Sequence, residues 1–196
     1  MNIKIKNALF TVVIISLMVS CSTEQSKYDK IVQQELAKGQ RFDSLFLGLY
    51  LGMHAKKFYD TCTEMNKMGL ITAGTGGTKV LYYIKDGLKY PASMNFFPDF
   101  YKNNIYHISV NYHYDAWAPW NKNLYADSLK IRLVDYYKKQ YPGNDFIILK
   151  DKLNNDVFFK VDGNRRILIG SADEQFVNVD ITDLLIEEKL KKESKK

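Results

Sequence analysis

Cysteine is scarce in this chain: Cys21 and Cys62 are the only two among 196 residues. So few cysteines exclude a fold held by a disulfide framework, and the hydrophobic core must supply the stability. Cys62 shares a helical apolar stripe with Phe58 and Met65 and has no second cysteine nearby. This pattern favours a buried side chain over a reactive thiol.

Histidine is also rare, with His54, His107 and His113 as the only examples. His107 and His113 lie on one extended segment, where six residues separate them by roughly 20 Å, so they cannot bind the same ion. His54 adds no recognisable ligand spacing. We therefore expect no metal site and no cofactor.

The motifs of common enzymes are missing. The chain has no Gly-x-Ser-x-Gly elbow, no His-Glu-x-x-His helix and no cysteine nucleophile with a placed histidine. The glycine-rich segment 74–77 leads into an expected strand rather than a helix, which argues against a phosphate loop. We expect a protein that is not an enzyme, with a hydrolase based on Asp115 and Asp127 as the least favoured alternative.

A long membrane-spanning run is absent too, but a shorter apolar run stands near the N-terminus. Lys4 and Lys6 precede an apolar stretch at 8–19, and Ser20 comes directly before Cys21. About a dozen apolar residues are fewer than the roughly 20 needed to cross a bilayer, and the order is that of a secretory signal peptide. The segment resembles the lipobox of bacterial lipoproteins. That resemblance implies that residues 1–20 are removed and that Cys21 carries the lipid.

The same resemblance implies a location in the cell envelope, anchored to a membrane through Cys21. Ser22 stands where aspartate would signal retention in the inner membrane, which favours the outer membrane. Lys+Arg number 28 and Asp+Glu 22, and removing the two lysines of residues 1–20 leaves 26 against 22, or +4. This excess is small and scattered, so we expect no nucleic-acid partner.

The mature chain divides into a tether and one domain. Residues 21–40 are polar without a strong apolar stripe, and we expect a lipid anchor followed by a flexible tether. Residues 41–196 are expected to form a single α+β domain. Its first element is predicted as a strand, because leucines alternate along residues 45–52.

The rest of the domain shows the same element order twice. Each of two amphipathic helices precedes about four short strands, and a last helix follows. The expected helices are 55–68, 126–140 and 182–192, and the expected strands are 70–73, 78–85, 91–97, 104–116, 145–150, 156–161, 166–170 and 175–180. We predict two tandem α-ββββ units, repeats 41–118 and 119–192, with the helices on one face of an antiparallel sheet.

This layout resembles the tandem helix-plus-sheet fold of β-lactamase-inhibitor proteins. The Gly52-Met53 opening before the first helix is similar to that of the small lipoprotein of the outer-membrane barrel-assembly machine. The resemblance implies protein binding on an open sheet face without catalysis. The whole chain also resembles small uncharacterised lipoproteins of Gram-negative envelopes. This second resemblance implies no particular activity.

The clearest strand, 104–116, has two different faces. Alternate residues from Tyr106 to Tyr114 are apolar and are expected to pack, whereas those from His107 to Asp115 are polar and are expected to meet water or a ligand. A loop carrying Trp117 and Trp120 follows. These tryptophans are expected to fill the core, and the alternative is an aromatic platform formed with Tyr112 or Tyr114.

We therefore expect a non-catalytic, membrane-anchored envelope lipoprotein that binds a protein partner through the polar sheet face and the aromatic loop. The alternative is a glycan-binding lipoprotein that uses the two tryptophans as its platform. The candidate binding residues are His107, Asn111, Tyr112, His113, Asp115, Trp117 and Trp120.

Overall fold

The computed structural model describes residues 25–151 and 153–194. The expected signal peptide, the lipid-bearing Cys21 and Ser22 lie outside the described residues. Within the described part of the chain, no helix has both the length and the apolar character needed to cross a membrane.

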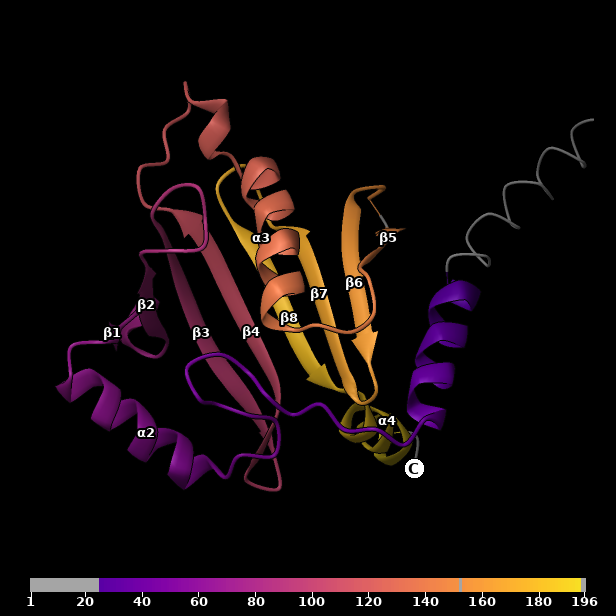
Figure 1. The fold of residues 1–196 in the computed structure, drawn as a ribbon. Helices are drawn as coiled ribbons and strands as arrows, with labels where there is room; N and C mark the ends of the chain where they lie inside the picture. The colour runs from indigo at the N-terminus through magenta and orange to yellow at the C-terminus, as the bar shows by residue number, and fades with distance from the viewer. Residues whose placement is uncertain (1–24, 152, 195–196) are drawn as a thin grey trace, which may run out of the picture.

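One antiparallel sheet of eight strands organises the protein, in the order β1-β2-β3-β4-β8-β7-β6-β5 (Figure 1). The strands are β1 Thr72–Ala73, β2 Val80–Ile84, β3 Ala92–Tyr101, β4 Asn104–Tyr114, β5 Ile147–Lys150, β6 Asp156–Asp162, β7 Arg165–Ser171 and β8 Val177–Asp183. The labelled helices are α2 Ala55–Lys67, α3 Ala126–Gln140 and α4 Leu184–Glu193, and short 3-10 helices occupy Thr75–Gly77 (η1) and Lys122–Leu124 (η2). Another helix spans residues 25–37. The predicted α+β class and antiparallel sheet are confirmed.

The core lies between α3 and the sheet. On β4, alternate side chains such as Val110 and Tyr112 are buried and stand opposite Val179 and Val177 of β8. The apolar stripe of α3, which includes Leu129 and Leu133, packs in the same core cluster. Because strand residues alternate between faces, this burial leaves the intervening residues of β4 on the opposite face of the sheet.

A register shift between Asp99 and Phe100 changes which residues at the start of β4 point toward the core. The pairing jumps from Asp99↔His107 to Phe100↔Ile105, so Tyr106 is the extra residue. Ile105 is consequently buried, whereas Tyr106, expected on the packed face, is only half-buried. Alternation alone could not reveal this bulge.

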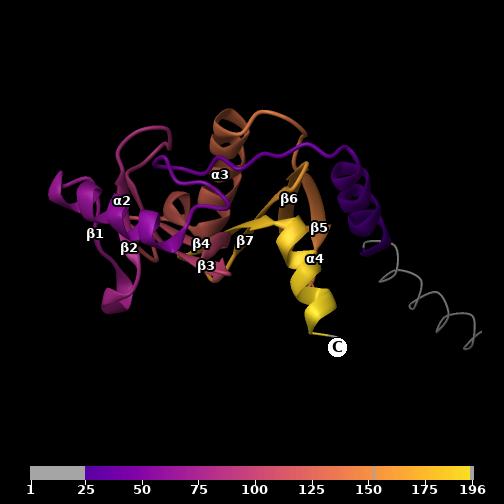
Figure 2. The ribbon, with the colours of Figure 1, turned by 90° about the horizontal axis from the view of Figure 1, so that it is seen from below.

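The helices do not share one face of the sheet, so that prediction is wrong. Tyr112 meets Tyr137 of α3 on one face. On the other face, Arg166 forms an ion pair with Glu187 of α4. Figure 2 shows α3 and α4 on opposite sides of the sheet. α4 begins directly after β8, at the N-cap Asp183, so its position is set by where that strand ends.

Residues 25–37 differ from the expected tether, because they form a helix that packs on the domain. Val32 is buried in a small cluster with Phe159, Val161 and Leu184. Tyr28, Ile31 and Leu36 pack around the same cluster. A narrow stripe of apolar residues is therefore enough to dock the helix, since β6 and α4 supply the apolar side chains against which it packs.

The expected strand at 45–52 is absent. Leu47 and Gly48 have left-handed backbones with φ of 54° and 72°, and Gly52 has φ of 83°. The segment therefore turns repeatedly, with only a single bridge between Ser44 and Tyr50. Leu49 and Leu51 are nevertheless buried, so the alternating leucines correctly indicated burial but not the backbone conformation.

Candidate binding surface

The polar face of the sheet centre lies opposite α3. It is formed where β3, β4 and β8 run side by side, and its residues are Asp99, His107, Ser109, Asn111, Asn178 and Asp180. The register places His107 opposite Asp99, Ser109 opposite Asp180 and Asn111 opposite Asn178. We call this set the polar sheet face. Ser109 and Asn178 are exposed, so part of this face is open to a ligand.

His107 links two carboxylates of the polar sheet face. Its Nδ1 lies 2.8 Å from Asp99 Oδ2 and its Nε2 lies 3.2 Å from Asp180 Oδ1. Burial alone would lower the pKa of His107, but the hydrogen bonds to Asp180 and Asp99 outweigh it and raise the pKa above its usual value. For Asp180, burial opposes ionisation, yet the hydrogen bond from His107 leaves its pKa lowered. The arrangement thus favours a charged imidazole held by two carboxylates.

A groove of about 730 Å³ extends from His107 toward α4. Arg166 lies in it and forms an ion pair of 2.8 Å with Glu187. Thr182 and Leu190 are also among its lining residues. Asp99, Arg166 and Asp180 were not predicted as members of this surface. Alternation along a strand distinguishes its two faces, but it does not show which strands lie beside β4.

Two further candidate residues lie at the edge of this surface. His113 is half-buried, with its ring 5.2 Å from that of Phe176, and burial lowers its pKa. Asp115 is exposed and accepts a hydrogen bond from the Ser93 hydroxyl. Of the predicted binding residues, His107 and Asn111 belong to the polar sheet face, and His113 and Asp115, the latter just after β4, continue from its end.

Tyr112 does not belong to a binding surface, which corrects the prediction. Only 1% of the residue is exposed, and its hydroxyl lies 2.8 Å from that of Tyr137 inside the core. Tyr114 is equally buried. After the bulge, the even positions of β4 from Ile108 to Tyr114 are buried on the α3 side of the sheet, so neither tyrosine can complete a platform with the tryptophans.

The two tryptophans have different environments. Trp120 is 85% exposed, which overturns the expectation that it fills the core. Trp117 is half-buried, and its ring centroid lies 6.0 Å from that of Tyr125. The Tyr125 hydroxyl donates to the Pro119 carbonyl oxygen at 2.7 Å, and Lys122 Nζ lies 4.0 Å from the Tyr125 ring centroid. The loop is thus built around Tyr125, a residue that the sequence analysis did not single out.

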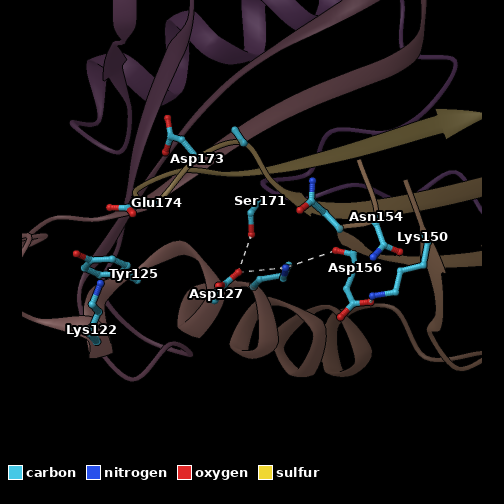
Figure 3. A pocket seen from close by; sticks show the side chains of 12 residues that line it. Lys122, Tyr125, Asp127, Lys150, Asn154, Asp156, Ser171, Asp173 and Glu174 are labelled. Carbon is cyan, nitrogen blue, oxygen red and sulfur yellow. Dashed lines mark hydrogen bonds and ion pairs between the residues drawn. The ribbon is translucent and has the colours of Figure 1, made fainter. Parts of the chain in front are cut away.

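A second hollow lies beside this loop, at the start of α3 (Figure 3). It has a volume of about 790 Å³ and is lined by residues of η2, α3 and the turns β5–β6 and β7–β8. Asp127, named above for a hydrolase, lines it, whereas Asp115 is not among its lining residues. We call it the α3 cavity.

Residues 25–151 and 153–194 contain no cluster of three or more His, Cys, Asp or Glu side chains arranged to hold a metal ion. Comparison with protein-family models gave no match. Comparisons with curated proteins and with solved structures gave none either.

Proposed function

We propose that this chain is a non-catalytic envelope lipoprotein that binds a protein partner through the polar sheet face. The observation that carries the proposal is the open strip of Asp99, His107, Ser109, Asn111 and Asn178 on the side of the sheet opposite α3. Strands hold these side chains at fixed positions, so a partner would meet a preorganised surface. The carboxylates on this face disfavour nucleic acid, whose phosphates are negative.

The arrangement of the strands supports two tandem α-ββββ units as the basis of this surface. α2 is followed by β1 to β4, and α3 is followed by β5 to β8. The last strand of each group lies at the centre of the sheet, where β4 pairs with β8. In this proposal the polar sheet face forms at the junction of the two units.

Attachment to the outer membrane through Cys21 is the second part of the proposal, supported by the lipobox-like sequence that ends in Ser20-Cys21. Mass spectrometry of the N-terminal peptide from membrane fractions tests it. We expect a peptide that begins at Cys21 with acyl chains attached, and a Cys21→Ala variant that leaves the membrane fraction. A peptide that begins at Met1 and carries no lipid would contradict the proposal.

Site-specific photo-crosslinking in cells tests the binding surface. A photoreactive amino acid at Ser109 should capture a partner, whereas one at Asp135, exposed on α3, should not. The variant Asn111→Lys with Asn178→Lys should abolish capture from position 109, because it replaces the two amides that hydrogen-bond across β4 and β8 at 2.9 Å. Equal capture from both positions, or capture that survives the double variant, would place the binding surface elsewhere.

Glycan binding is the second candidate function, and one observation favours it. A tryptophan that is 85% exposed, as Trp120 is, places a large apolar ring in water. Aromatic rings in loops that flank a hollow suit stacking on sugar rings. This candidate uses the loop from Trp117 to Tyr125 and does not require the polar sheet face.

A further inference from the structure

The α3 cavity is an open hollow lined by four separate parts of the chain. The η2 loop supplies Lys122 and Tyr125, and the first turn of α3 supplies Asp127. The turn β5–β6 supplies Asn154, and the turn β7–β8 supplies Glu174. Figure 3 shows these side chains around one hollow. Its volume of about 790 Å³ is within the usual range for small-molecule sites.

Lys130 fixes the floor of the cavity. Its side chain is only 10% exposed, and its Nζ lies 3.2 Å from Asp127 Oδ1 and 3.4 Å from the Asp156 carbonyl oxygen. Ser171 Oγ donates to the same Asp127 oxygen at 3.2 Å. Lys130 and Ser171 thus hold the Asp127 carboxylate in place. Because the Asp127 side chain is 87% exposed, the carboxylate can still accept hydrogen bonds from a ligand in the cavity.

The lining groups suit a ligand that carries many hydroxyls. Carboxylates and amide oxygens accept hydrogen bonds, and lysine and amide N–H groups donate them. A sugar hydroxyl both donates and accepts, so it can pair with each kind. The lining supplies both kinds from Asp127, Lys130, Lys150, Asn154, Asn155 and Asp156.

The charges of the lining nearly cancel. Three lysines, at 122, 130 and 150, face four acidic residues, at 127, 156, 173 and 174. Lys150 is paired with Asp156 at 2.6 Å. A strongly anionic ligand would meet the four acids and a strongly cationic one would meet the three lysines, and like charges at close range are unfavourable. The cavity therefore favours a neutral ligand.

The loop beside the cavity is aromatic, and its Tyr125 is the one aromatic side chain among the described residues of the lining. Tyr125 packs beside Trp117, and the exposed Trp120 belongs to the same loop. Aromatic faces bind the apolar C–H faces of sugar rings, whereas the polar floor binds their hydroxyls. A saccharide has both kinds of surface, apolar C–H faces and hydroxyl groups. It therefore matches this lining better than a peptide or a metal ion does.

We propose that the α3 cavity binds a neutral oligosaccharide, with Asp127 and Lys130 bonding its hydroxyls and the Trp117–Tyr125 loop contacting a ring face. This inference rests on the glycan-binding candidate and is independent of the polar sheet face. Failure of the sugar test would therefore leave the crosslinking test of the protein partner unaffected, and the reverse also holds.

Tryptophan fluorescence reports on the loop that the sugar would contact, because the chain has only two tryptophans and both lie in this loop, Trp117 beside the lining residue Tyr125. The full-length protein would be purified in a detergent without a sugar headgroup, such as an amine oxide. It would then be titrated with maltotriose, mannotriose and triacetylchitotriose. We expect a saturable emission change and protection from acrylamide quenching with at least one of them, and no such response to a sulfated disaccharide at the same concentrations.

Asp127→Asn is the test variant and Asp135→Asn, on the exposed side of the same helix, is its matched control. Loss of a hydrogen bond to a charged group should weaken sugar binding about tenfold or more in the first and leave the second unchanged. Circular dichroism would verify that both variants are folded. Absence of a saturable response to all three sugars, tighter binding of the sulfated sugar, or equal affinity of the two variants would overturn the proposal.

Discussion

The hydroxyl of Tyr112 on β4 lies 2.8 Å from the hydroxyl of Tyr137 on α3, and both residues are 1% exposed. This hydrogen bond joins the sheet to the helix inside the core. We expect Tyr112→Phe or Tyr137→Phe to reduce the free energy of unfolding by about 1–3 kcal/mol, because each leaves one buried hydroxyl without its partner. Urea unfolding would measure the loss.

The double variant Tyr112→Phe with Tyr137→Phe should lose less stability than the sum of the two single variants, since it removes both hydroxyls together. Additive losses would show that the two hydroxyls are not coupled.

His107 should make the stability depend on pH. Its pKa is raised in the folded state by Asp180 and Asp99, against the effect of burial. The stabilisation is fully present below the pKa of an unfolded histidine, about 6.5, and is lost as the pH rises through the higher folded pKa. The stability advantage of wild type over His107→Gln, from urea unfolding, should therefore be larger at pH 6 than at pH 9.

His113 offers a control with the opposite sign. Burial lowers its pKa, so its protonation favours the unfolded state, and this destabilisation disappears as the pH rises above about 6.5. The advantage of wild type over His113→Gln should accordingly increase with pH near that value. The same trend in both variants would contradict the environments described for the two rings.

Asp162 balances two buried cations. Its Oδ2 lies 3.2 Å from Lys160 Nζ and 3.4 Å from Arg165 Nη2, and all three side chains are almost completely buried. Asp162→Asn leaves both cations without their shared carboxylate and should cost about 3–5 kcal/mol of unfolding free energy. The control is Asp145→Asn, whose exposed pair with Lys138 at 3.4 Å should contribute little. Similar unfolding midpoints for the two variants would contradict this role.

The docking of residues 25–37 can be tested by proteolysis. Val32→Glu places a charge among Phe159, Val161 and Leu184, so the helix should leave the domain and trypsin should cleave faster after Lys38 or Arg41. Gln33→Glu, at an exposed position of the same helix, is the control. Equal cleavage rates in the two variants would mean that Val32 does not hold the helix in place.

Cys62 should be an unreactive thiol in the folded protein. Burial raises its pKa to about 11, so little thiolate is present at neutral pH. We expect slow reaction with a disulfide reagent such as DTNB, and an acceleration in urea. A Cys62→Ala variant identifies the signal of this residue. Fast reaction of native Cys62 at neutral pH would contradict its half-buried environment.

The fold was largely predictable because its strong signals are local. The apolar stripes of residues 55–68 and 126–140 and the strand runs of 145–180 correspond to α2, α3 and β5 to β8 within a few residues. Segment 45–52 was not predictable, since left-handed turns at Leu47 and Gly48 bury alternate leucines as a strand would. The faces occupied by α4 and by residues 25–37 depend on tertiary contacts that no local pattern specifies.

The candidate sites were predictable only in part for the same reason. The outward positions of His107 and Asn111 follow from alternation along one strand. Their neighbours Asp99 and Asp180 follow from strand pairing, which the sequence does not show. The α3 cavity combines four segments that are distant in sequence, so Asp127 was noticed as a carboxylate but its partners Lys130 and Ser171 were not.

The docked helix limits how far the proposed lipid anchor can lie from the domain. The first described residue of the helix, Gln25, follows Cys21 by four positions, and four residues of chain span at most about 14 Å even when fully extended. A lipid on Cys21 would thus hold the start of this helix within about 14 Å of the lipid attachment point. A partner or glycan in the same envelope would then have to approach the membrane surface itself, and a partner embedded in that membrane would be within immediate reach.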